Sequence, residues 1–151
     1  IEENIRIANA EALKSVAGDL EIGETVAVTG FSGVEESTDL FRDGKKVGIA
    51  LLLSGSGYGG SFSIIASYDT NGALMGAKMT VDSETAGLGK KAEESWYMDL
   101  FKGMGVDKPF PSAPKDLSAD DTALVSGATV TFKGVSKALK NGSDYIKEGA
   151  K

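Results

Sequence analysis

The first seventeen residues carry apolar side chains at helical spacing. Acidic residues occupy the first turn, and good helix formers fill the rest. The residues on the apolar face are Ile1, Ile5, Ala8 and Val16. Gly18 and Asp19 interrupt the pattern, which predicts an amphipathic helix over residues 1–17.

Between residues 24 and 82 the pattern changes to short apolar runs separated by turn sequences such as Asp-Gly-Lys and Thr-Asn-Gly. The runs are ETVAVTGFSG (24–33), TDLFRD (38–43), KKVGIALLLS (45–54), SFSIIASYD (61–69) and ALMGAKMTVD (73–82). Consecutive short strands joined by tight turns are typical of an antiparallel sheet. We therefore predict an antiparallel or mixed sheet of about five or six strands.

Helical spacing returns after this strand-rich region. Residues 89–102 form one predicted helix, whose inward-facing residues are Ala92, Trp96, Met98, Leu100 and Phe101. A connector over 103–121 holds all three prolines. A second helix is predicted to start near Thr129 or Thr131, to bury Val135, Ala138 and Leu139, and to end at Asn141–Gly142, with Gly142 as its C-cap. Residues 144–151 are interpreted as a tail or a last helix. The resulting fold class is α+β, one domain over 1–151 with an N-terminal helix and two C-terminal helices packed on the sheet.

Composition narrows the possible chemistry. The net charge of −6 argues against nucleic acid, which binds basic surfaces. The chain has no cysteine and no histidine, which excludes disulfides, thiolate chemistry and histidine catalysis. The adjacent carboxylates, such as Glu93-Glu94, diverge on a helix or strand and make poor acid–base pairs. We therefore expect no catalytic residue and no metal site, and any redox chemistry requires a bound cofactor.

No apolar run approaches the roughly 20 residues that span a bilayer. The chain begins at Ile1 and not at methionine, which we interpret as a processed or shortened form. A signal or membrane anchor upstream of Ile1 is compatible with this interpretation.

Two glycine-rich stretches suggest ligand contact. GSGYGG (55–60) matches a dinucleotide-binding fingerprint, but the residues that follow read as a strand, whereas that fingerprint must open a helix. We interpret it as a hairpin or bulge that lets a backbone or ligand approach Tyr58. In DSETAGLGKK (82–91), Gly87 and Gly89 flank Leu88 ahead of the predicted helix, near Lys90. Free backbone N–H groups there suit an electron-rich or anionic ligand. The alternative, favoured by composition alone, is a strand-to-helix turn capped locally by Glu84 and Thr85.

The stretch SGATVT (126–131) opens the last predicted helix with small and hydroxyl residues. Small residues allow a tight turn, and one serine or threonine caps the helix. Two further hydroxyls remain. A threonine hydroxyl at a helix N-terminus is well placed to carry a phosphate ester, because the helix dipole and unpaired N–H groups stabilise phosphate charge. The residues alone leave both interpretations open.

Three features occur in a fixed order along the chain. They are ETAGLGKK, then Trp96 with Phe101-x-Gly103, and then SGATVT at the start of a predicted helix. Together they resemble the FMN-binding domain of the Rnf-complex G subunit and of the C subunit of Na⁺-translocating NADH:quinone reductase. The Gly-Tyr-Gly turn and the later Asp-x-x-Gly turn are also similar to that family. The resemblance covers about residues 40 to 140.

The resemblance implies a cofactor and its site. FMN is attached by a phosphoester to the threonine of Ser126-Gly127-Ala128-Thr129, and Thr131 is the nearest competing hydroxyl. A separate flavin transferase that uses FAD installs it, and Gly127 and Ala128 leave room for that enzyme. Lys90 tunes the flavin ring or meets the phosphate. The remaining residues of the implied ring site are Glu84, Thr85, Gly87, Leu88 and Gly89.

Two positions depart from the family pattern. Ala86 stands where the family usually has proline, which loosens the turn. The family also places an aspartate three residues before Ser-Gly, whereas here the nearby acids are Asp120 and Asp121.

The implied function is electron transfer by covalent FMN, as a carrier and not an independent enzyme. The domain would belong to a membrane-bound, ion-translocating redox complex, on the extracytoplasmic face, held by an N-terminal anchor absent from this chain. One alternative is a free-standing extracytoplasmic flavin shuttle or reductase domain. Another is a non-redox ligand-binding domain of the same fold.

Overall fold

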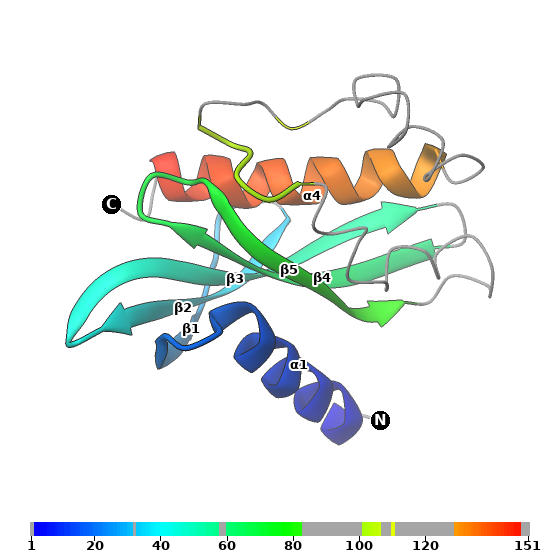
Figure 1. Ribbon diagram of the computed structural model, residues 1–151. Coiled ribbons are helices and arrows are strands. Elements are labelled where there is room, and N and C mark those ends of the chain that lie inside the picture. Colours follow the sequence, from blue (N-terminus) through cyan, green and yellow to red (C-terminus); the bar gives the residue numbers. More distant parts are fainter. Residues whose placement is uncertain are drawn as a thin grey trace.

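Five strands form one antiparallel sheet with a helix on each face (Figure 1). The computed structural model describes residues 2–31, 33–57, 60–82, 101–106, 110 and 129–148. The strands lie in chain order, so each pairs with its sequence neighbours. The elements are α1 (Glu2–Ala17), β1 (Glu21–Ala27), β2 (Val34–Arg42), β3 (Lys45–Gly57), β4 (Gly60–Asp69), β5 (Leu74–Asp82) and α4 (Thr129–Glu148). The predicted α+β class, the antiparallel sheet and the N-terminal helix are confirmed.

The turns show which local predictions were right. Asp43 and Gly44, between β2 and β3, both have positive φ, 53° and 78°, as the Asp-Gly hairpin turn requires. The predicted first strand, 24–33, was wrong at its end. β1 stops at Ala27, and the chain beyond it turns at Gly30 and Gly33, whose φ values of 82° and 87° favour glycine.

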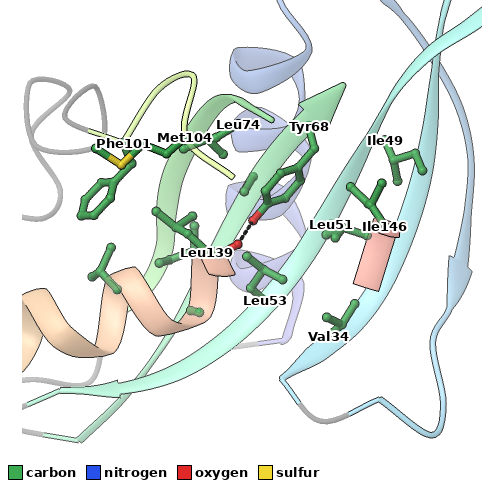
Figure 2. Packing of buried hydrophobic residues seen from close by; sticks show 14 residues of the cluster. Val34, Ile49, Leu51, Leu53, Tyr68, Leu74, Phe101, Met104, Leu139 and Ile146 are labelled. Atoms are coloured by element: carbon green, nitrogen blue, oxygen red, sulfur yellow. Dashed lines mark hydrogen bonds between the residues drawn. The ribbon is translucent and has the colours of Figure 1, made fainter. Parts of the chain in front are cut away.

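Alternate residues of the central strands divide between two apolar layers. On one face, Leu51 of β3 and Ile64 of β4 pack against Leu139 of α4, all three fully buried. On the other face, Leu40 and Ala50 pack with Ala17 of α1. Figure 1 shows α4 and α1 on opposite sides of the sheet, and Figure 2 shows the larger layer beneath α4.

Helix α4 is longer than the sequence predicts. Val135, Ala138 and Leu139 are buried as expected, but the predicted end at Gly142 was wrong, since α4 continues to Glu148 and absorbs part of the predicted tail. Gly142 lies inside the helix. A glycine is required at this position because a Cβ there would come within 2.8 Å of Cζ of Tyr68. The glycine therefore provides space for a ring and does not terminate the helix.

The other predicted C-terminal helix, 89–102, lies outside the described residues except for its last two positions. Phe101 is fully buried, as predicted, but it belongs to a turn. This turn joins the start of β5, because the N–H of Leu74 donates to the carbonyl of Met104 at 2.9 Å. Neither described helix is both long and apolar enough to cross a membrane.

Hydrogen bonds from side chains fasten the second half of α4 to the rest of the domain. The Tyr68 hydroxyl donates to the carbonyl of Leu139 at 2.7 Å (Figure 2). The Ser143 hydroxyl donates to the carbonyl of Gly72 at 2.7 Å, and the Lys147 ammonium donates to the carbonyl of Gly105. These bonds fix α4 against the sheet along this half of its length.

The buried phenol of Tyr68 gives a prediction. Burial, together with the carboxylate of Asp144, raises the pKa of Tyr68 well above its usual value. Folding therefore favours the protonated phenol. Its contribution to stability is complete below pH 10, the usual tyrosine pKa, and is lost as the pH rises above that value. We expect Tyr68→Phe to lower the free energy of unfolding by about 1 kcal/mol at pH 7. Above pH 10 its stability should fall less steeply than that of the wild type, as measured by urea unfolding at several pH values. An equal alkaline slope in both proteins would contradict the assignment.

Candidate functional site

The N-terminus of α4 is the described part of the predicted cofactor site. Thr129 is the first residue of the helix, and Thr131 lies two positions further, within the first turn. The first N–H groups of a helix have no intrahelical acceptor and carry the positive end of its dipole. The first turn of α4 contains no acidic residue. This helix end therefore suits a phosphate group.

The stretch GSGYGG forms a hairpin, as predicted, and not a dinucleotide-binding loop. β3 ends at Gly57, β4 begins at Gly60, and the two glycines pair across the ladder. A strand follows the glycines where the dinucleotide fingerprint requires a helix. Tyr58 is one of the two residues at the tip, and it lies outside the described residues.

The topology brings three distant segments to one end of the sheet. Phe62 pairs with Asp82, so the end of β5 lies beside the start of β4 and the β3–β4 hairpin. Helix α4 has its second half at the opposite end, where Ser143 contacts Gly72 in the β4–β5 turn. Its first turn therefore points toward the hairpin end, as Figure 1 shows.

The other predicted site residues lie outside the described part of the chain, so their contacts stay predictions. Those at 84–90 follow β5 directly, and those at 126–128 directly precede α4. Both segments therefore attach to the end of the sheet that the hairpin occupies. The residues concerned are Tyr58, Glu84, Thr85, Gly87, Leu88, Gly89, Lys90, Ser126, Gly127 and Ala128.

Sequence reasoning missed the residues that hold α4 in place. Tyr68 and Leu139 are 71 positions apart, and so are Gly72 and Ser143. No local pattern links such pairs. The sequence signal for these contacts was Gly142, a glycine at a position with helical spacing. A glycine there is also typical of a helix C-cap, which is how it was interpreted.

The FMN-binding domain family model matches residues 57–144, from the hairpin to the second half of α4. The chain is 32% identical to the G subunit of the ion-translocating oxidoreductase complex of Escherichia coli (strain K12) over 110 residues, which cover 69% of this chain and 52% of that protein.

Two further relatives carry the same name. The protein of Cereibacter sphaeroides (strain ATCC 17029 / ATH 2.4.9) is 31% identical over 106 residues, 67% of this chain and 48% of its own length. That of Vibrio parahaemolyticus serotype O3:K6 is 26% identical over 111 residues, 71% of this chain and 53% of its own length. The chain thus spans about half the length of the curated relatives it matches. With the family model covering more than half of its residues, the chain belongs to the family of FMN-binding domains.

Proposed function

We propose that this domain carries FMN through a phosphoester on Thr129 and serves as an electron carrier in a membrane-bound, ion-translocating redox complex. The observation that carries the proposal is the position of Thr129 as the first residue of a twenty-residue helix. A phosphate attached to the hydroxyl of Thr129 would lie close to the helix N-terminus, where the unpaired N–H groups and the helix dipole favour negative charge.

The surroundings of the helix start fit a phosphate. No acidic side chain in the first turn opposes it, and Lys133, which is exposed, follows one turn later. Thr131 is the competing hydroxyl, two residues further into the first turn of the helix. Ser126, Gly127 and Ala128 precede the helix as small residues that leave a modifying flavin transferase room to reach Thr129.

We propose that the residues after β3 and β5 hold the ring. Tyr58 at the hairpin tip and the segment from Glu84 to Lys90 start from the end of the sheet to which α4 directs its first turn. Gly87 and Gly89 allow close approach of the backbone at Leu88, and Lys90 supplies a positive charge for the ring or the phosphate. When bound, FMN supplies one- and two-electron redox chemistry that the side chains of this chain lack.

The names of the relatives support a proposal about partners. Proteins named as the G subunit of an ion-translocating oxidoreductase complex share this domain. We propose that the domain exchanges electrons with other subunits of such a complex, at the extracytoplasmic face of the cell membrane. A rigid attachment of α4 to the sheet suits this role, because it holds the site of attachment at a fixed position relative to the domain surface.

The test is co-expression of the chain with a flavin transferase, followed by intact mass spectrometry. We expect the mass of FMN less one water to be added, with flavin fluorescence that remains on the protein band after denaturing electrophoresis. If the protein is yellow but loses its flavin on denaturation, the flavin is bound noncovalently and the proposed covalent link is wrong. Colourless protein of unmodified mass would favour a non-redox domain.

A further inference from the structure

The outer strand β1 is almost entirely exposed. It ends the described sheet, and no other described strand pairs with its outer edge. Six of its seven residues are exposed. Ile22 and Val26 have 40% and 54% of their surface exposed, although both are large apolar residues of a strand. An edge of this kind offers a row of free backbone donors and acceptors to another chain.

A groove lies beside this edge, on the face of the sheet that α1 covers. It encloses about 240 Å³ between α1 and strands β1 to β4. Its apolar lining includes Leu13, Leu52 and Ile65. Its polar lining residues are Thr25 and Thr38, whose hydroxyls are 2.6 Å apart, and Glu36. Side chains of a strand added at β1 would reach this groove, because alternate residues of such a strand point to the α1 face.

The negative charge on β1 and β2 indicates which kind of strand can pair with this edge. Glu21, Glu24, Glu35 and Glu36 are exposed on β1 and β2, and none forms an ion pair with another described residue. A second copy joined edge to edge would bring two such acidic strands together, and like charges on facing strands are destabilising. A basic strand would instead pair with them.

We propose that the free edge of β1 and the adjoining groove bind an extended segment of a partner protein whose side chains alternate between apolar and basic. The segment adds a sixth strand to the sheet, its backbone pairs with β1, its apolar side chains enter the groove, and its lysines or arginines meet the glutamates. The groove lies on the α1 face, opposite α4, and none of the described residues that line it is proposed to hold FMN. We therefore expect binding not to depend on FMN at Thr129.

The backbone indicates where the edge can be blocked. The N–H of Val28 donates to the carbonyl of Glu35 at 2.9 Å, toward β2. Successive N–H groups of a strand point to opposite edges, so the N–H of Ala27 points to the free edge. Proline at position 27 removes that donor without breaking the β1–β2 ladder, as is tolerated on edge strands.

The probe is a fluorescein-labelled peptide of about eight residues that alternates valine and lysine, titrated with the full chain at about 0.1 M salt and followed by fluorescence anisotropy. Glu24→Lys should weaken binding about tenfold, because a favourable cross-strand pair becomes a repulsive one. The matched control is Glu148→Lys, which changes the net charge equally at the exposed end of α4 and should leave affinity within about twofold of wild type. Ala27→Pro, with an unchanged melting temperature, should abolish binding.

Several results would overturn the proposal. One is equal binding of a valine–glutamate peptide, and another is equal weakening by Glu24→Lys and Glu148→Lys. Sedimentation that shows a dimer dissociated by Ala27→Pro would assign the edge to a second copy instead. The same titration on Thr129→Ala protein separates this proposal from the flavin assignment, since only the latter depends on that residue.

Discussion

In the Thr129→Ala variant, co-expressed with a flavin transferase, we expect no covalent FMN at all. The substitution removes the hydroxyl of the first residue of α4, which is the oxygen of the proposed ester. Thr131→Ala should keep the full adduct, because it leaves the hydroxyl of Thr129 in place. Intact mass spectrometry of both variants and of the wild type gives the result directly.

The structural effect of Thr129→Ala must be separated from the chemical one. Loss of a hydroxyl at a helix start costs about 1 kcal/mol where that hydroxyl caps the helix. Thr129→Ser controls for this, since it retains a hydroxyl at the same position. We expect the serine variant to be folded as the wild type is and to be modified, if more slowly. An adduct that persists in Thr129→Ala and disappears in Thr131→Ala would move the attachment site to Thr131.

Gly142→Ala should lower the free energy of unfolding by about 2–3 kcal/mol. The new Cβ would lie 2.8 Å from Cζ and 3.0 Å from Cε1 of Tyr68, in a fully buried layer. The ring must then move and give up its hydrogen bond to the carbonyl of Leu139. Alanine is about 1 kcal/mol better than glycine inside a helix, so this gain offsets only part of the loss. Urea unfolding at pH 7 measures the difference.

The control for Gly142→Ala is the same change in a Tyr68→Leu background. Leucine lacks all three tyrosine atoms nearest to Gly142, so the added methyl group finds space. There the substitution should be neutral or stabilising by up to about 1 kcal/mol, through helix propensity alone. Equal destabilisation in both backgrounds would mean that the cost does not come from the Tyr68 ring.

The sheet was predictable because its signals are local. The Asp-Gly turn at 43–44 fixes a two-residue hairpin through its own backbone preferences, and the run at 45–54 is apolar enough to be the central strand. The end of β1 was not predictable in this way. The run ETVAVTGFSG continues past Ala27 in the sequence, whereas the strand ends there, ahead of the turn that contains Gly30 and Gly33.

The candidate cofactor site was predictable only as a set of motifs. SGATVT predicts Thr129 as the attachment residue through resemblance, which stays a prediction, and α4 begins at that residue. The sequence did not indicate that the β3–β4 hairpin, the end of β5 and the start of α4 lie at the same end of the sheet, because strand order and not spacing along the chain places them there. The contact between Tyr68 and Gly142 could not be inferred for the same reason, and Gly142 was therefore interpreted as the end of a helix.

The fastening of α4 bears on the order of events during maturation. Its bonds to Tyr68, Gly72 and Gly105 involve Leu139, Ser143 and Lys147, and the first of these lies ten residues, about 15 Å along the helix axis, from Thr129. The proposed attachment at Thr129 therefore lies well away from these bonds. If Thr129 carries the flavin, we expect this half of α4 to be in place before the flavin is attached.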